Sequence, residues 1–272
     1  MFMIDFDNNE LSEVGKEACK DLVKPVAQES GGLLSLIPRA IRASLSGVEK
    51  WILNKEYSVK ETQKLLEIKL ANVSPEKIEA PEAYIAVPVI NSLSYTFASD
   101  VLLNMYANLL ATSMIKDSKW EVHPSFVEII KQLSPDEAKL LLKLSKHSGE
   151  NEFPLISLGM RKNTENPHSF LSEHYIKINN FSNIGDDVCE RPNKIMTYID
   201  NLARLQLIEI VDDESVSDFD YDPLINHETI DNYKTNNKVY DGFDWEIKQY
   251  MFKITQLGFD FIDLCVAGNK IR

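Results

Sequence analysis

Apolar residues recur every three to four positions through most of the first 150 residues, which is the spacing of helices with one buried face. The broadest apolar segment, residues 84–115, is predicted to hold two buried helices, with Leu102, Met105, Leu109 and Leu110 in the core. The predicted helices cover residues 11–28, 33–53, 58–73, 82–97, 99–116, 123–133 and 135–147.

Three helix starts can be predicted from capping residues. Ser134 precedes Pro135, Asp136 and Glu137, an arrangement in which serine caps the first turn and glutamate reaches back to the cap. Ser58 is predicted to cap the helix that runs to residue 73. Asp100 is a candidate cap for the helix at 99–116.

The pattern changes after residue 149, where short apolar runs alternate with polar segments. Together with the helix that ends near residue 147, the order of predicted elements is typical of a winged helix, although another α+β domain with the same order is an alternative. We predict a mainly α fold, in which a helical bundle (residues 1–133) precedes an α+β winged-helix-like domain (residues 134–272). Strands are predicted at 153–158, 175–178, 207–211 and 250–254, and further helices at 192–205 and 256–266.

Residues 205–233 form the most acidic segment of the chain, with nine Asp and Glu and no Lys or Arg. Like charges repel one another, and such a segment gains little by burial. We therefore predict a long exposed loop within the second domain, with residues 212–222 mobile.

The chain has 272 residues and a formal net charge of −13. A polyanion such as nucleic acid is bound by a basic face, so this balance argues against general nucleic-acid binding. The three cysteines, Cys19, Cys189 and Cys265, are far apart and suggest no disulfide framework. The apolar stretches are shorter than a membrane span requires. We expect a soluble, cytoplasmic protein.

Motifs that carry enzyme chemistry are absent from the sequence, including the phosphate-binding, dinucleotide-binding and zinc-protease patterns. Asp218, Asp220 and Asp222 imitate the start of a calcium-binding loop, but Pro223 and Thr229 stand where glycine and glutamate are needed. We expect a non-enzymatic protein with no catalytic residues, no cofactor and no metal site.

The helix at 192–205 would be the recognition helix of a winged helix that binds DNA. Its candidate contacts are Arg191, Lys194 and Arg204. The acidic segment that follows would repel phosphate, so nucleic-acid binding is unlikely and protein contacts fit the charge better.

The helix at 33–53 combines an apolar face with three bases, so it is a second candidate interaction surface. Packing on the helical core or a subunit interface is the favoured interpretation, and membrane contact stays open but is not favoured. Its candidate interaction residues are Ile37, Arg39, Ile41, Arg42, Leu45 and Trp51.

Residues 123–142, HPSFVEIIKQLSPDEAKLLL, and residues 102–117, LLNMYANLLATSMIKD, resemble the abortive-infection alpha family of bacterial proteins. The match is most specific over residues 100–145 and extends loosely from the helix at 33–53 to the C-terminus. The resemblance implies a role in antiphage defence, and it carries over no catalytic residues. We expect a sensor, adaptor or effector that acts through a protein partner, which includes a second copy of itself; a DNA-binding transcriptional regulator and a membrane-acting effector are the alternatives.

Overall fold

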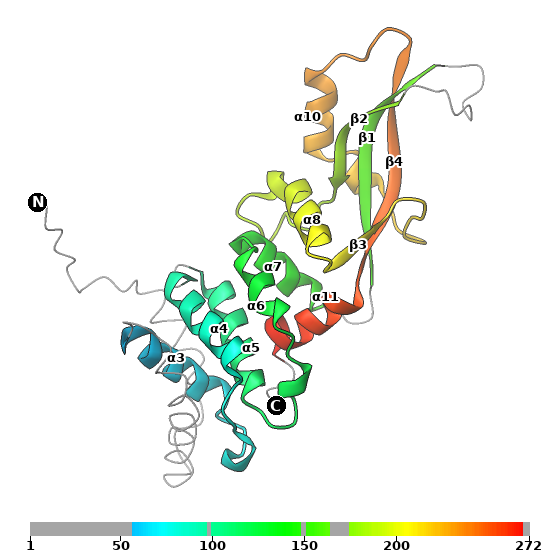
Figure 1. Ribbon diagram of the computed structural model, residues 1–272. Helices are drawn as coiled ribbons and strands as arrows, with labels where there is room; N and C mark the ends of the chain where they lie inside the picture. Colours follow the sequence, from blue (N-terminus) through cyan, green and yellow to red (C-terminus); the bar gives the residue numbers. More distant parts are fainter. Residues whose placement is uncertain (1–55, 97–98, 148–150, 164–173, 269–272) are drawn as a thin grey trace, which may run out of the picture.

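The computed structural model describes residues 56–96, 99–147, 151–163 and 174–268 (Figure 1). Helices in the first half form a body, and a long antiparallel sheet leads away from it. The first helices are α3 (Glu56–Lys69), α4 (Ala83–Thr96), α5 (Asp100–Ser113), α6 (Ser125–Lys131) and α7 (Pro135–Leu144), with short 3-10 turns at Pro75–Lys77 and Lys119–Glu121.

The apolar width of α5 is explained by its position inside the helical body, where it contacts α3, α4, α6 and α7. The predicted core residues Leu102, Met105, Leu109 and Leu110 are all buried, which confirms that prediction. Ser99, and not Asp100, caps this helix, because its hydroxyl accepts a hydrogen bond from the Leu102 amide.

Helix α3 includes Ser58, so the prediction that this serine caps the helix is wrong. The capping box at Ser134 is confirmed: the Ser134 amide donates to the Glu137 carboxylate at 2.6 Å, and the Glu137 amide donates to the Ser134 hydroxyl at 3.3 Å.

The second half builds one four-stranded antiparallel sheet in the order β2-β1-β4-β3. Its strands are β1 (Glu152–Lys162), β2 (His174–Phe181), β3 (Ile208–Val211) and β4 (Phe243–Ile254). Its helices are the 3-10 turn η3 (Pro192–Lys194), α8 (Ile195–Arg204), α9 (Asp222–Ile225), α10 (Glu228–Asn236), α11 (Gln256–Phe261) and the π-helical turn η4 (Ile262–Ala267).

The prediction of a mainly α fold with a winged-helix-like second domain is wrong. The structure is about 50% helical and 19% strand, with a curled four-stranded sheet. Strand β2 adds a fourth strand outside β1, and the connection from β3 to β4 holds α9 and α10 in place of a wing hairpin. The N-terminal part of the predicted bundle, residues 1–55, lies outside the described residues.

The acidic segment is also more ordered than predicted. Residues 212–215 and 217–220 are exposed, as a loop should be. From Tyr221 onward, however, the chain forms α9 and α10, which bury Leu224 and Ile230 completely. Tyr233 of α10 packs edge-on against Trp245 of β4, with 6.1 Å between the ring centroids. The segment between β3 and β4 that holds α9 and α10 therefore packs on β4.

A glycine fixes the return of the chain to the helical body. Thr255 caps α11 by accepting a hydrogen bond from the Gly258 amide at 2.9 Å. A Cβ atom on Gly258 would lie 2.0 Å from the carbonyl oxygen of Leu207. Only glycine lets α11 approach the start of β3 so closely.

Candidate functional site

Helix α7 lies between the helical body and the sheet domain, since it contacts α5, η4 and α8. Its apolar side buries Ala138, Leu140 and Leu141. The opposite side carries Lys139 and Lys143, which are neighbours on the helix because they are four residues apart, and Lys146 follows just beyond the end of α7. This side forms one wall of the candidate site.

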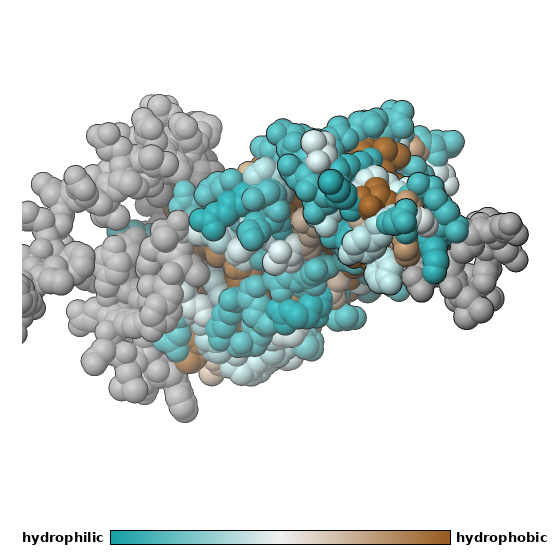
Figure 2. Space-filling model, turned by 90° about the horizontal axis from the view of Figure 1, so that it is seen from above, coloured by the Kyte–Doolittle hydropathy of each residue, from teal (hydrophilic) through white to brown (hydrophobic). Residues whose placement is uncertain are grey.

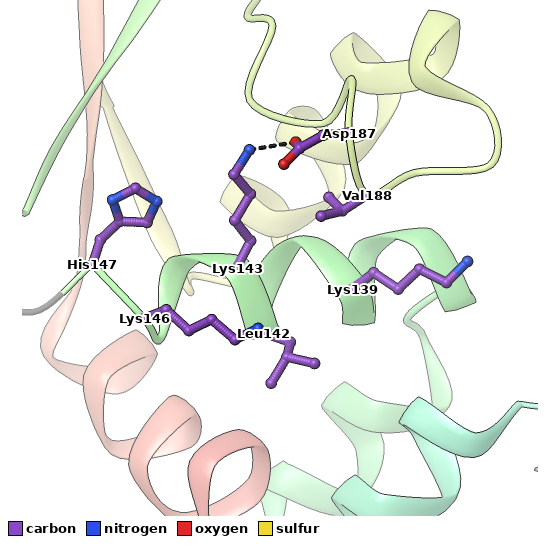
Figure 3. A pocket seen from close by; sticks show the side chains of 7 residues that line it. All are labelled: Lys139, Leu142, Lys143, Lys146, His147, Asp187 and Val188. Carbon is purple, nitrogen blue, oxygen red and sulfur yellow. Dashed lines mark hydrogen bonds and ion pairs between the residues drawn. The ribbon is translucent and has the colours of Figure 1, made fainter. Parts of the chain in front are cut away.

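Two hollows along α7 share Lys143 and His147 in their linings, and we call them together the α7 groove. The first, of about 440 Å³, lies between α7 and the turn at residues 183–190; in Figure 3, Lys143 reaches across toward Asp187, with Val188 beside it. The second, of about 720 Å³, continues to Phe153 at the start of β1 and to the loop at 216–219. Its other lining residues are Asn151, Glu152, Pro154, Ser182, Asn183 and Ile184.

Ion pairs hold two of the lysines against the opposite wall. Lys143 donates to the Asp187 carboxylate and, at 3.0 Å, to the carbonyl oxygen of Ile184. Lys139 donates to Glu190 at 2.7 Å. The hydrogen bond from Lys143 lowers the pKa of Asp187, and the hydrogen bond to Glu190 raises the pKa of Lys139. Asp187 and Lys139 are therefore charged at neutral pH.

Lys146 differs from these two lysines. Its side chain is exposed, and within the described part of the chain it makes no ion pair or hydrogen bond. In Figure 3 it lies with Leu142 on the other side of α7 from Asp187. The groove thus offers a cation that an incoming acidic group can reach.

A buried carboxylate in the first turn of α7, that of Asp136, holds the opposite wall of the groove in place. Asp136 accepts hydrogen bonds from the amides of Glu190 and Arg191, both at 2.9 Å, and from the Tyr198 hydroxyl at 3.0 Å. Burial raises the pKa of Asp136. The three hydrogen bonds together lower this pKa by more than burial raises it, so it lies below the ordinary value of an aspartate. The ionised Asp136 therefore ties the first turn of α7 to the turn before α8.

The potential nucleophiles beside this wall are protonated at neutral pH. Burial raises the pKa of the Cys189 thiol to about 11. Burial and the hydrogen bond to Asp136 raise the pKa of Tyr198 to about 12. A thiol attacks as the thiolate, so Cys189 is a poor nucleophile here. Cys265 is completely buried, and Cys19 lies outside the described residues.

The predicted recognition residues stand at the two ends of α8. Arg204 is exposed, but its guanidinium donates to Asn201 and, at 3.0 Å, to Gln132, which follows α6. It therefore links α8 to the helical body. Arg191 and Lys194 are exposed before α8.

The candidate interaction residues Ile37, Arg39, Ile41, Arg42, Leu45 and Trp51 lie outside the described residues. Among the described residues, no group of three or more His, Cys, Asp and Glu side chains is arranged to hold a metal ion. None of the described helices is both long enough and apolar enough to cross a membrane.

Sequence reasoning missed the α7 groove. The spacing of Lys139, Lys143 and Lys146 was a readable signal for one basic helix face. The opposite wall comes from residues 183–190 and 216–219, more than 35 positions away, and only the folded chain places them beside α7.

Comparison with known families shows to which family the chain belongs. The family model described as "Abortive infection alpha" matches residues 54–265, which include every element from α3 to α11. The chain belongs to the abortive infection alpha family. Neither a curated protein nor a solved structure matches it. Membership supports a role in abortive infection, an antiviral defence, and confirms the resemblance seen in residues 102–142.

Proposed function

We propose that this member of the abortive infection alpha family acts without catalysis, as a sensor, adaptor or effector that binds another protein through the α7 groove. The observation that supports this proposal is the composition of the groove. Apolar side chains such as Leu142 and Val188 lie among charged groups that are already paired. Polar and apolar groups mixed in this way are typical of surfaces that bind proteins reversibly.

The second hollow extends this surface. Phe219, which is 40% exposed, lines this hollow together with Phe153 and Pro154. An aromatic side chain held at the border of a hollow suits the central contact of a protein interface. A polypeptide segment is long enough to contact both hollows at once.

The protonation states of the neighbouring groups favour binding over chemistry. An activated nucleophile has a lowered pKa or an adjacent base, whereas the pKa of Cys189 is raised to about 11. The carboxylate nearest to it, Asp136, is saturated by three hydrogen bonds and does not serve as a base.

Phage plating on bacteria that carry the gene tests the groove. The double variant Leu142→Gln/Lys146→Glu changes one side chain of α7 and one just beyond its end, both in the lining of the first hollow, and leaves the Asp136 hydrogen bonds in place. We expect it to lose at least ~10-fold of the protection given by the wild type, because interface side chains near an exposed anchor carry much of the binding energy.

Lys131→Glu is the matched control, since Lys131 is an exposed lysine on the neighbouring helix α6. Circular dichroism and protein levels in the cell must match the wild type for all variants. Full protection by the folded groove variant would contradict the proposal.

A further inference from the structure

Strand β2 lies at one edge of the sheet and pairs with β1 alone among the described strands. The side chains of Tyr175 and Ile176 in its first half are 43% and 55% exposed. The second half is covered, because Asn180 donates to Asp200 of α8 at 2.6 Å. An edge of this kind presents unpaired backbone groups to an added strand.

Lysine commonly protects such an edge by projecting a charge across it. Lys177 does not: its ammonium group bonds the Tyr240 hydroxyl at 3.2 Å and lies 4.8 Å from the Tyr240 ring and 5.6 Å from the Tyr175 ring. The register passes from Gly159↔Ile176 to Leu158↔Ile178, so Lys177 is the extra residue of a β-bulge. The one lysine on this edge is thus held over an aromatic face of the sheet.

Three aromatic rings form that face. Tyr175 packs edge-on against Tyr240 with 5.9 Å between the ring centroids, and it packs at a tilt against Phe243 with 5.6 Å between the centroids. Tyr240 is itself 51% exposed. Figure 2 looks down on this end of the molecule, whose surface is mostly hydrophilic with a few small apolar patches.

We propose that a second copy of this chain pairs with β2 in antiparallel orientation, with the two-fold axis at Ile176. The strand is complementary to itself in that register. Ile176 faces Ile176 of the other copy, so the apolar side chain most exposed on this strand is covered, and Tyr175 faces Lys177 on either side of that pair. No like charges stand opposite each other.

The shape of the molecule permits this pairing. The strands lead away from the helical body, and the exposed half of β2 lies toward their far end (Figure 1). Antiparallel strands around a two-fold axis direct the two helical bodies in opposite directions. Because β2 contributes no residue to the lining of the α7 groove, the inference does not rest on the proposed function.

Sedimentation velocity on the purified full chain, over about two orders of magnitude in concentration, tests the inference. We expect a monomer–dimer equilibrium in the wild type. Ile176→Lys should raise the dimer Kd at least ~10-fold, because it places two lysines opposite each other. Phe259→Lys is the matched control, since Phe259 is an exposed apolar residue (41%) on α11.

Disulfide trapping tests the register. Directly opposite Cβ atoms in an antiparallel pair lie ~4.5–5.5 Å apart, close to disulfide geometry. Ile176→Cys should therefore form a covalent dimer under mild oxidation. Phe259→Cys, which reports on other contacts, should not form one. The wild type, which reports on the native cysteines, should not form one either.

A wild type that stays monomeric throughout, or a dimer that Ile176→Lys leaves unchanged, would overturn the proposal. Because Ile176 is exposed, both variants should keep the circular dichroism spectrum of the wild type. The dimer test and the groove test are independent. A groove substitution that abolishes antiphage protection says nothing about the dimer, and a monomeric wild type says nothing about the groove.

Discussion

At the scale of the residue, Asp136 ties the start of α7 to the turn before α8. Its carboxylate accepts two backbone hydrogen bonds and one from Tyr198. Asp136→Asn replaces one acceptor oxygen by an NH₂ group that faces donors. We expect a loss of ~1–3 kcal/mol in the free energy of unfolding, measured by urea denaturation at neutral pH.

The lowered pKa of Asp136 sets the pH dependence of that loss. A carboxylate with a lowered pKa in the folded state contributes its full stability above the ordinary aspartate pKa of about 3.9, and the contribution disappears as the pH falls through the folded-state value. The difference between wild type and Asp136→Asn should therefore narrow in acid. Tyr198→Phe, which removes one donor of three, should cost less, and a larger loss for Tyr198→Phe would contradict this account.

At the scale of the element, the start of α7 depends on a cap that the sequence shows plainly. Ser134→Ala removes the acceptor of the Glu137 amide, and we expect thermal unfolding to show a loss of ~0.5–2 kcal/mol. Ser145→Ala at the other end of the helix is the control, because the Ser145 hydroxyl bonds the Leu142 carbonyl and leaves the first turn untouched. Equal effects at both ends would show that the cap contributes nothing specific.

Elements defined by local chemistry were predictable, and elements defined by distant contacts were not. The start of α7 follows from four consecutive residues, Ser134 to Glu137. Helix α10, by contrast, has a mostly polar sequence, and only Ile230 is fully buried in it. The sequence therefore suggested a loop. The long part of β4 was missed for the same reason, because Trp245 gains its packing partner, Tyr233, from that unpredicted helix.

At the scale of the whole molecule, the family and the basic face of α7 could be predicted, but the groove could not. The motif around Ser134 led to the abortive infection alpha family, whose model covers residues 54–265. The second wall of the groove depends on how the turn at 183–190 is tied to Asp136. Such a contact joins residues more than 50 positions apart and leaves no periodic signal in the sequence.

The end of the chain returns to the middle of the helical body, across the domain boundary predicted at residues 133 and 134. Asn108 of α5 is buried and donates to the carbonyl oxygens of Cys265 at 2.9 Å and Val266 at 3.3 Å. Phe126 of α6 packs edge-on against Phe261 of α11, with 5.5 Å between the ring centroids. The helical body and the sheet domain are thus joined by buried contacts.

These contacts predict that the two parts unfold together. Hydrogen exchange with mass spectrometry in increasing urea should give the same opening free energy for peptides from α5 and from α11. Asn108→Ala leaves the carbonyl groups of η4 without this donor and should lower both values together by ~1–3 kcal/mol. Asn104→Ala, at an exposed position one turn earlier on α5, is the control. A drop confined to α11, with α5 unchanged, would show instead that the sheet domain opens independently of the helical body.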